Sequence, residues 1–377
     1  MHSRAPSDAD VVVIGGGLSG LAAALGVKQR GASVEVLEAA QRPGGTIGTF
    51  HRDGALYETG PNSALDTTPL INALLEATAA GAERIETSAD ARTRFIVRDG
   101  KLVPLPASPP AFLATRAFSL RAKLRLTAEP FIARAREGTE ETVAEFVRRR
   151  LGTEFLDYAV DPFVSGVYAG DPERLSLPAA FPRLHALEQR YGSLMRGQFA
   201  GASEPGGNPQ TPKSRAHSFS FRNGMQTLID ALARTLGCVE TGVRVERVER
   251  DTAGTWIITG KRDSETIVRY STAAIVAVPA AEASGLVRDL APAAAQGLAA
   301  IDYASVVSVA TAYPRVGVAD PLAGFGFLVP RKENRRILGS LFSSSMFENR
   351  APAGTVLLTT FVGGRRRPDL PQRTDEE

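Results

Sequence analysis

The sequence contains one cysteine, Cys238, and only four histidines among its 377 residues. A single thiol cannot form an intrachain disulfide, so no feature of the sequence requires an oxidising compartment. We interpret Cys238 as a small buried apolar residue rather than as a reactive thiol. The histidines lie far apart, and neither a metal-ligand spacing nor a nucleophile-base arrangement is visible. We therefore predict no metal site and name no catalytic acid or base.

The chain also lacks a strong charge imbalance and any long apolar run. Its 44 basic and 41 acidic residues are scattered, and a net charge of +3 gives little support for nucleic-acid binding. No stretch reaches the roughly 18 consecutive apolar residues of a spanning helix. The N-terminal residues MHSRAPSDAD lack the apolar core of a signal peptide. We expect a cytoplasmic protein that binds no nucleic acid, with contact to the cytoplasmic face of a membrane and a homodimer both left open.

Glycines are abundant where the first apolar run ends. Residues 11–14 are typical of a buried parallel strand, and residues 18–28 have the composition of a helix. Between them Gly15, Gly17 and Gly20 fit the pattern G-x-G-x-x-G. The first glycine permits a tight turn, the second lets the backbone approach a pyrophosphate, and the third lets helix and strand pack closely. This arrangement predicts a dinucleotide site at the helix N-terminus.

A second strand at residues 33–37 ends at Glu38. Its distance from the glycines is close to the roughly 20 residues expected for the acid that binds a ribose hydroxyl. The stretch QRPGGTIG follows at residues 41–48, and YETGPNS at residues 57–63. A simple nicotinamide site has no need of this second glycine pair.

These three phased motifs resemble the amine-oxidase-like FAD proteins. The resemblance implies bound FAD, with Gly44 and Gly45 close to the phosphates and the Gly60-Pro61 turn beside the flavin ring. It also implies that the strand carrying Val245 contacts the adenine through its backbone. The predicted cofactor-binding residues are Gly15, Gly16, Gly17, Leu18, Ser19, Gly20, Glu38, Ala39, Arg42, Gly44, Gly45, Thr46, Gly60, Pro61, Asn62, Ser63 and Val245.

The remaining segments predict an α/β protein with a discontinuous Rossmann-like FAD-binding domain. We assign residues 1–90 and 216–285 to that domain and residues 91–106 and 286–377 to a mixed-sheet substrate domain. Residues 107–215 form a helical insertion that ends in a polar, Gly- and Pro-rich loop at 202–215. Expected helices are 69–80, much of 112–156 and the end of the stretch 219–236; expected strands are 94–106, paired around Asp99-Gly100, and four segments within 242–281.

The start of the insertion reads as a basic amphipathic helix. Apolar residues such as Leu120 and Leu124 alternate there with Arg121, Lys123 and Arg125. Such a helix can lie on an anionic membrane surface. An ordinary helix packed on the core with a solvated basic face explains the pattern equally well.

The middle of the chain, residues 161–197, resembles the family of protoporphyrinogen oxidase and the bacterial coproporphyrinogen III oxidase. Shared features are the segment GVYAGDPERLS, the later EQRYGSL, and the stretches GFGFLVP and FVGGRRRP. The resemblance implies an FAD-dependent oxidation of protoporphyrinogen IX to protoporphyrin IX in heme biosynthesis. Dioxygen would be the acceptor and hydrogen peroxide the second product.

A porphyrinogen needs an apolar pocket with a cation for its propionates. The resemblance places Arg94 on a propionate and the Gly166 carbonyl against the macrocycle, and arginine suits bidentate carboxylate binding. Phe325, Phe327 and Leu328 could supply apolar walls. The predicted substrate-binding residues are Arg94, Gly166, Phe325 and Leu328.

Other activities remain open from the sequence. Coproporphyrinogen III is the nearest alternative substrate, and the basic residues Arg331, Lys332, Arg335 and Arg336 could serve its extra propionates or lie on a solvated loop. A flavin amine oxidase, a carotenoid desaturase and a non-catalytic porphyrin-binding flavoprotein are more distant alternatives.

The family's sequences continue with a Gly-Asn/Asp turn that closes over the flavin and a last helix. The sequence here reads RRRPDLPQRTDEE at its end, which we interpret as a charged tail. We therefore expect weaker FAD retention and lower stability for the 377-residue chain.

Overall fold

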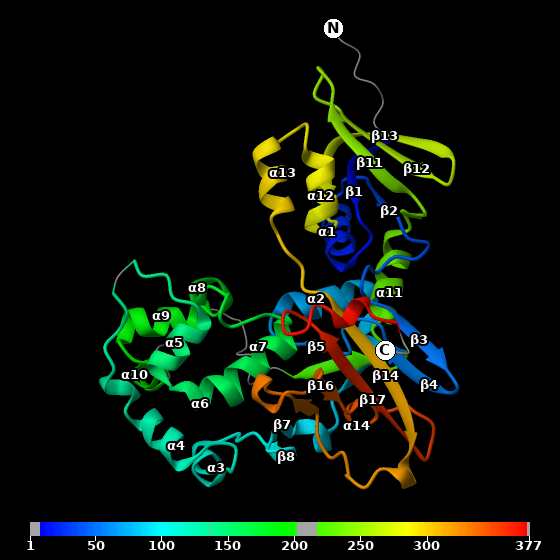
Figure 1. Ribbon diagram of the computed structural model, residues 1–377. Helices are drawn as coiled ribbons and strands as arrows, with labels where there is room; N and C mark the ends of the chain where they lie inside the picture. The colour runs from blue at the N-terminus through cyan, green and yellow to red at the C-terminus, as the bar shows by residue number, and fades with distance from the viewer. Residues whose placement is uncertain (1–7, 137, 202–216, 375–377) are drawn as a thin grey trace. The chain divides into compact units, whose positions relative to one another are not determined.

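The computed structural model describes residues 8–136, 138–201 and 217–374 (Figure 1). The predicted loop at 202–215 lies outside these residues. The chain divides into two compact units, Met1–Glu86 with Gln210–Tyr303 and Thr87–Pro209 with Ala304–Glu377. The second unit contains both the helical insertion and the segments predicted to bind substrate. The assignment of three domains from the sequence stays a prediction.

The first unit contains a six-stranded sheet whose centre is parallel. The strand order is β10-β2-β1-β13-β12-β11. Strand β1 pairs in parallel with β2 and β13, and β2 pairs in parallel with β10. Strands β11 and β12 continue the sheet in antiparallel order from β13. The bounds are β1 Ala9–Ile14, β2 Val34–Glu38, β10 Val239–Thr241, β11 Arg244–Arg250, β12 Trp256–Arg262 and β13 Glu265–Val276. Two strand segments predicted separately, around 265–271 and 273–281, are largely the single strand β13.

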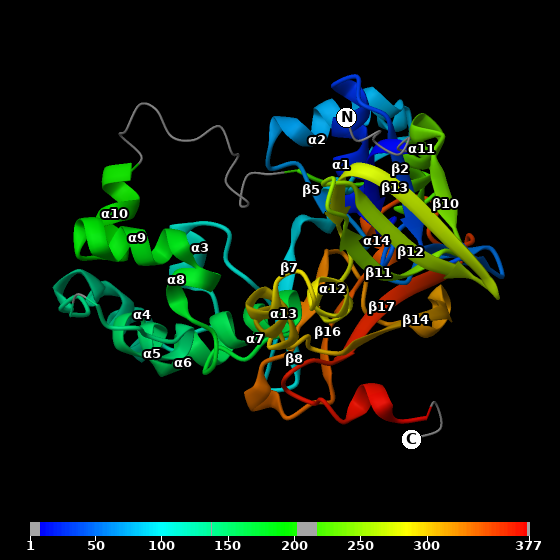
Figure 2. The same ribbon diagram turned by 90° about the horizontal axis from the view of Figure 1, so that it is seen from above.

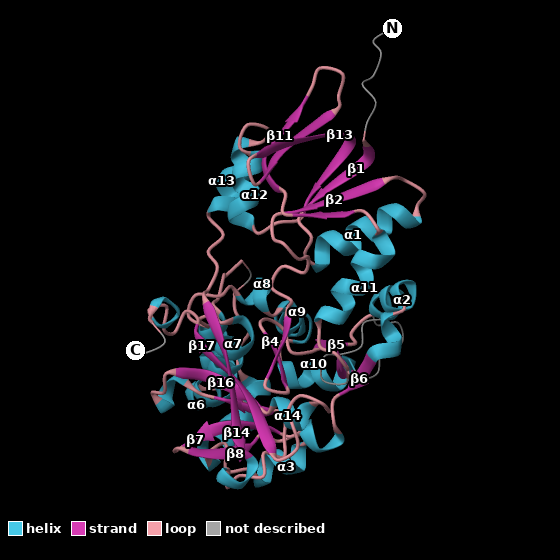
Figure 3. Ribbon diagram, turned by 90° about the vertical axis from the view of Figure 1, so that its right-hand side faces the viewer, coloured by secondary structure: helices cyan, strands magenta, loops and turns pink. Residues whose placement is uncertain are grey.

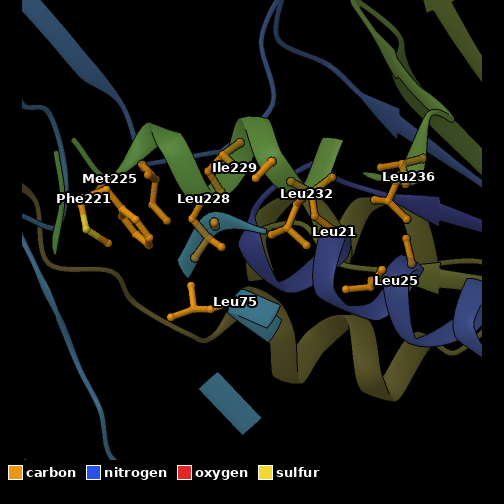
Figure 4. Packing of buried hydrophobic residues seen from close by; sticks show 14 of the residues in the cluster. Leu21, Leu25, Leu75, Phe221, Met225, Leu228, Ile229, Leu232 and Leu236 are labelled. Atoms are coloured by element: carbon orange, nitrogen blue, oxygen red, sulfur yellow. The ribbon is translucent and has the colours of Figure 1, made fainter. Parts of the chain in front are cut away.

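Helices cover both faces of this sheet, as Figure 3 shows. Successive side chains of β1 alternate, so Val13 packs with helices α1 (Leu18–Gln29) and α11 (Gln226–Leu236), whereas Val12 and Ile14 lie on the other side. That other side packs against Leu286 of α12 (Ala280–Val287), which is followed by α13 (Pro292–Ala299). Leucines of α1 and α11 meet in the larger core cluster (Figure 4). Apolar packing on both faces of the sheet explains why the central strands are nearly continuous apolar runs.

Smaller elements complete the first unit. Helix α2 (Pro69–Thr78) begins at Thr68, whose hydroxyl accepts the Leu70 N–H, and proline occupies its first turn. Two small sheets also belong to this unit. One is the pair β3 (Thr49–Arg52) and β4 (Ala55–Glu58). The other has three strands in the order β5 (Ala64–Leu65), β9 (Ser218–Phe221) and β6 (Arg84–Glu86). A 3₁₀ turn, η1 (Ala80–Glu83), follows α2.

The second unit is built on a mixed six-stranded sheet of order β14-β17-β16-β15-β7-β8. Strands β7 and β8 form the predicted hairpin around Asp99-Gly100, with Asp99 and Gly100 both in the left-handed region. Strand β7 pairs in parallel with β15, and the other pairs are antiparallel. The bounds are β7 Arg94–Arg98, β8 Lys101–Pro104, β14 Val306–Pro314, β15 Gly326–Leu328, β16 Ile337–Leu341 and β17 Thr355–Gly363, with α14 at Ser343–Met346 and 3₁₀ turns η2 Ala89–Arg92, η5 Arg315–Gly317, η6 Arg331–Glu333 and η7 Leu370–Gln372.

Short helices make up the insertion of the second unit and gather beside one another (Figure 2). Their bounds are α3 Pro109–Ala114, α4 Leu120–Thr127, η3 Glu129–Phe131, α5 Val143–Arg150, α6 Thr153–Phe155, η4 Leu156–Val160, α7 Asp161–Tyr168, α8 Leu177–Ala180, α9 Pro182–Tyr191 and α10 Leu194–Gly201. The predicted helical stretch 112–156 is therefore interrupted, most clearly between η3 and α5. Segment η4 is a π-helical turn that runs directly into α7.

A buried ion network joins these short helices. The Arg150 side chain is fully buried and donates to Glu129 from η3 (2.9 Å) and to Glu188 from α9 (2.7 Å). Burial opposes ionisation of Glu188, but hydrogen bonds from Arg149 and Arg150 outweigh it and hold the pKa of this carboxyl below its ordinary value. The pKa of Glu129 is lowered in the same way, against burial, by Ser193 and the N-terminal amides of α10.

Candidate functional site

The first candidate site lies where β1 meets α1 in the first unit. Gly15 has φ +108°, and a Cβ on it would come within 2.6 Å of the Ala277 carbonyl oxygen. A Cβ on Gly20 would come within 1.9 Å of the Gly15 oxygen, so this glycine permits close packing of helix and strand. A Cβ on Gly17 would meet nothing within 4 Å, because Gly17 faces open space. The three glycines thus have different roles: Gly15 permits the turn, Gly20 permits close packing of helix and strand, and Gly17 leaves open space beside the helix.

The N-terminus of α1 is open to an anion. Its N-cap residue Gly17 supplies no side-chain hydrogen bond, and the first turn contains no acidic residue. The leading amides of a helix have no partner within the helix and carry the positive end of its dipole. A pyrophosphate would satisfy both requirements.

Glu38 at the end of β2 is fixed by backbone contacts. Its carboxylate accepts the Gly16 N–H at 2.6 Å and the Ala40 N–H at 2.7 Å. These contacts hold the end of β2 against the glycine turn that follows β1. They leave the carboxylate beside the cavity, at the position predicted for a ribose contact.

The glycine pair Gly44-Gly45 lies against the glycine turn that follows β1. The Gly44 N–H donates to the Gly16 carbonyl at 2.8 Å, and Gly44 and Gly45 both have positive φ. Arg42 does not line the cavity; its guanidinium donates to the Ile47 carbonyl at 2.7 Å and to Gln226 at 2.9 Å. Arg42 therefore holds the shape of this loop.

These elements enclose a cavity of about 1040 Å³. Eleven of the predicted cofactor residues line it: Gly15, Gly17, Leu18, Ser19, Glu38, Ala39, Gly44, Gly45, Thr46, Pro61 and Val245. Six others lie outside the lining: Gly16, Gly20, Arg42, Gly60, Asn62 and Ser63. Gly60 lies under the loop, since a Cβ there would come within 2.1 Å of the Thr46 carbonyl oxygen. The cofactor role of each residue stays a prediction.

Sequence reasoning missed part of this lining. Val243 precedes β11 and Arg244 begins it, Val278 and Pro279 follow β13, and Arg288 follows α12. The sequence signals for these residues were the predicted strand that carries Val245 and an apolar strand that runs into proline at residues 275–279. The parallel pairing of β13 with β1 is what brings that segment beside the glycine turn. Large volume, bare glycines and an uncapped helix N-terminus together fit the ADP portion of FAD.

The second candidate site lies in the second unit and is a cavity of about 170 Å³. It collects all four predicted substrate residues, Arg94 from β7, Gly166 from α7, and Phe325 and Leu328 at β15. The other lining residues are Phe95, Phe163, Val167, Gly326, Phe327, Leu338, Gly339, Ser340, Leu341 and Phe361. This volume is below the roughly 300–1,000 Å³ of typical small-molecule sites. It can therefore hold one edge of a large substrate.

Arg94 supplies the single charged side chain among these lining residues. Its guanidinium carbon lies 4.9 Å from the centre of the Phe325 ring, a cation-π contact that leaves the guanidinium edge available for a carboxylate. Gly166 serves packing as well, because a Cβ on it would come within 2.4 Å of the Leu328 Cδ2 atom. The substrate roles of these residues remain predictions.

The basic cluster considered for extra propionates does not line this cavity. Arg331 pairs with Asp171 at 3.2 Å, and Lys332 pairs with Asp157 at 3.2 Å. Both cations line other depressions of the second unit instead. Arg335 is exposed on the loop before β16. In this structure the cluster is thus separate from the apolar pocket.

The described residues give little support for a reactive thiol, a metal site or a membrane-spanning helix. Burial raises the pKa of the Cys238 thiol, which packs at the margin of the large core cluster. Within residues 8–136, 138–201 and 217–374, no group of three or more His, Cys, Asp or Glu could hold a metal ion. Across the same ranges, none of the helices has the length and apolar composition needed to cross a bilayer.

Comparison with known proteins gives a consistent result. A family model described as flavin containing amine oxidoreductase matches residues 18–377. Protoporphyrinogen oxidase of Oryza sativa subsp. japonica chloroplasts is 36% identical over 98% of this chain and 72% of its own length. Coproporphyrinogen III oxidase of Bacillus subtilis is 29% identical over 94% of this chain and 77% of its own length. A crystal structure of an Exiguobacterium sp. 255-15 protein shares the fold, with a TM-score of 0.78, 23% identity, and coverage of 99% of this chain and 81% of that one.

Proposed function

The chain belongs to the flavin containing amine oxidoreductase family, and from this premise we propose that it is an FAD-dependent oxidase that converts protoporphyrinogen IX to protoporphyrin IX. The observation that carries the proposal is the apolar cavity of the second unit with Arg94 as its one cation. An apolar macrocycle with carboxylates at one edge matches that chemistry. The names of the rice and Bacillus relatives support a porphyrinogen as substrate.

Each part of the chain has a separate task in this reaction. Bound FAD supplies the two-electron oxidation chemistry, and we propose dioxygen as the final acceptor. The glycine turn of the first unit holds the cofactor by backbone amides and the α1 N-terminus. Arg94 binds a propionate and so fixes the orientation of the ring, while Phe325 and Leu328 exclude water from its edge. No proton transfer is assigned to a side chain.

Anaerobic mixing tests the proposal directly. The FAD-loaded protein is mixed without oxygen with protoporphyrinogen IX, with coproporphyrinogen III, or with putrescine as an amine control. We expect flavin absorbance to fall with protoporphyrinogen IX, and porphyrin fluorescence with hydrogen peroxide to appear after air is admitted. Flavin that no porphyrinogen bleaches would contradict the function, and bleaching by the amine alone would favour an amine oxidase.

Substrate choice is tested by kcat/KM for the two porphyrinogens. We propose protoporphyrinogen IX because Arg331 and Lys332 are engaged with Asp171 and Asp157, away from the apolar cavity. Coproporphyrinogen III, with two additional propionates, would leave carboxylates without cations there. A kcat/KM ratio that favours coproporphyrinogen III would reverse this choice while leaving the reaction type intact.

We further propose that the insertion touches an anionic membrane surface. On α4, Ala122 packs into the core, as the alternative reading of this helix expects, but Leu120 is 72% and Leu124 is 61% exposed and could contact a membrane surface. Arg121 and Arg125 lie on the same helix beside a groove of about 830 Å³. Apolar side chains flanked by arginines suit the boundary between headgroups and acyl chains.

Vesicle sedimentation tests this contact. We expect the protein to sediment with vesicles that contain phosphatidylglycerol and to remain free of vesicles made of phosphatidylcholine alone. The double substitution Leu120→Ser and Leu124→Ser should reduce binding at least tenfold, since each leucine contributes apolar area. Equal sedimentation of both proteins would contradict the proposal.

A further inference from the structure

Three consecutive arginines after β17 have different environments. The Arg367 side chain is 37% exposed and pairs with Asp369 at the surface. The Arg366 side chain is only 6% exposed. Our interpretation of residues 365–377 as a charged tail is therefore wrong for Arg366. A buried guanidinium requires an explanation, because desolvation of a charge is costly.

Arg366 is held by contacts to several segments. One of its terminal nitrogens donates to the Asp161 carboxylate at 3.0 Å and to the Ser165 hydroxyl at 2.6 Å. The other donates to the Val329 carbonyl at 2.6 Å. Asp161 is itself buried, and the same carboxylate oxygen also accepts the Arg331 N–H at 2.8 Å. The guanidinium thus bridges helix α7 and the chain that follows β15.

The bridged elements are the walls of the apolar cavity. Asp161 and Ser165 are one turn apart on α7, and the residues of α7 that line the cavity are Phe163, Gly166 and Val167. Strand β15 contributes its whole length to the lining, and β17 contributes Phe361. Arg366 is absent from the lining, so it acts on the cavity through its contacts with α7 and with the residue that follows β15.

The other end of α7 is tied to the same stretch of chain. The Arg365 N–H donates to the carbonyl of Ala169, the left-handed residue that ends the helix, at 2.8 Å. Consecutive residues, Arg365 and Arg366, therefore fix both ends of α7. A helix of eight residues held at both ends cannot slide along the sheet without breaking one of these contacts.

Stability alone does not explain Arg366. Buried ion pairs contribute little net stability compared with well-packed apolar residues. Among the described residues, the Arg366 Nε is one of the few buried side-chain polar atoms without a hydrogen-bond partner. Burial lowers the pKa of Arg366 although Asp161 opposes the shift, so the site is unfavourable for the charge. Local violations of this kind are expected where position matters for function.

We propose that Arg366 is a positioning residue for the substrate. It fixes α7 against β15, so that Phe163, Gly166 and Val167 form a wall of the correct shape. The inference rests on the proposed function, because it assigns the cavity to a porphyrinogen edge. A loosened α7 widens the cavity and weakens substrate binding. The chemistry at FAD, which the first unit holds, is affected much less.

Substitutions at the ion pair test the proposal. Arg366→Met removes the closer of the two guanidinium groups at the Asp161 carboxylate and leaves that of Arg331 at 3.6 Å, so this variant is expected to melt at a lower temperature. The double variant Asp161→Asn, Arg366→Met removes both charges and keeps an oxygen that can accept the Arg331 N–H, so its melting temperature should recover. Arg367→Met is the matched control, because it changes an adjacent arginine of the exposed pair.

The decisive readout is KM against kcat in the double variant. We expect KM for protoporphyrinogen IX to rise at least tenfold, kcat to change less than threefold and FAD affinity to stay unchanged, since small misplacements of a binding wall are costly. The control should match the wild type in all three. A double variant with wild-type stability and wild-type KM overturns the positioning role.

Failure of the proposed function has a different signature. A wild-type protein that oxidises neither porphyrinogen overturns the function but not yet the inference. In that case the Kd for protoporphyrin IX, measured by fluorescence titration, replaces KM. A tenfold weaker Kd in the double variant supports the positioning role, whereas equal Kd values, or no binding to the wild type, overturn it.

Discussion

The cavity of the first unit is large and combines glycines with charged side chains, whereas the smaller cavity of the second unit is mostly apolar. Gly15, Gly17, Gly44 and Gly45 line the first and present peptide groups to a volume of about 1040 Å³. Aromatic and aliphatic side chains and one arginine line the second. The first lining therefore suits a large polar ligand such as FAD, and the second suits the apolar edge of a substrate. The comparison predicts that substitutions in the two sites have different consequences.

The largest effect is expected from Gly17→Ala. Its Cβ would meet no protein atom within 4 Å and its φ of −70° suits alanine, so the fold should be unaffected. The methyl group would occupy space needed for close approach of the pyrophosphate. FAD affinity should fall about 100-fold, or about 2.7 kcal/mol, in a fluorescence titration of the apoprotein.

Gly297→Ala in α13 is the control for that prediction. Its Cβ also meets no atom within 4 Å, but Gly297 lies outside the cavity lining. FAD affinity should equal that of the wild type, and helix propensity should make this variant slightly more stable. If Gly17→Ala binds FAD as tightly as the control, the glycine turn does not hold the cofactor as we infer.

Arg94→Met should show the opposite profile. FAD affinity and melting temperature should not change, because Arg94 is exposed and contacts Phe325. The loss of a charge-assisted hydrogen bond, worth about 1.5–3 kcal/mol, should raise KM for protoporphyrinogen IX roughly 10- to 100-fold. Arg92→Met, at a nearby exposed arginine outside the cavity, serves as the control. An unchanged KM would remove Arg94 from the substrate site.

Gly166→Ala should perturb packing and binding together. The new Cβ would collide with Leu328, and overpacking of this kind costs about 1–3 kcal/mol. We expect a lower melting temperature and a KM raised about fivefold. Adding Leu328→Ala should restore the melting temperature by making room. A Gly166→Ala enzyme with normal stability would show that α7 can move away from β15.

The smallest effect is expected from lowering the pH, and it concerns the buried ion network of the insertion in the second unit. Because the pKa values of Glu129 and Glu188 are lowered in the folded chain, their contribution to stability is present above the ordinary carboxyl value of 4.5 and is lost as the pH falls below it. Hydrogen exchange between pH 6 and pH 3 should therefore show the insertion opening before the sheet of the first unit. Simultaneous opening of both units would contradict this.

How well the sequence predicted each site depends on how far apart its residues lie in the chain. The glycine turn, α1, β2 and Glu38 are consecutive, so spacing alone predicted their arrangement. The substrate residues Arg94, Gly166 and Phe325 lie far apart in the chain, and periodicity could not have brought them together. Only the family resemblance placed them in one site, and the structure collects them around one cavity.

Two further points depended on tertiary contacts. Sequence composition treated residues 365–367 alike, although Arg366 is buried against Asp161 and Arg367 is at the surface. The lining residues Val278 and Pro279 were missed because their position depends on the pairing of β13 with β1. Long-range pairing and burial of a single charge are not encoded in local pattern.

The π-helical turn η4 (Leu156–Val160), directly before α7, has a consequence for how this protein can change in evolution. A π turn contains one residue more than an α turn but covers nearly the same rotation about the helix axis. Loss of one residue in η4 would therefore convert it to an α turn, and Gly166 and Val167 would still face the cavity while Asp161 still faces Arg366. The chain can thus gain or lose a residue at η4 without altering the binding surface that α7 presents.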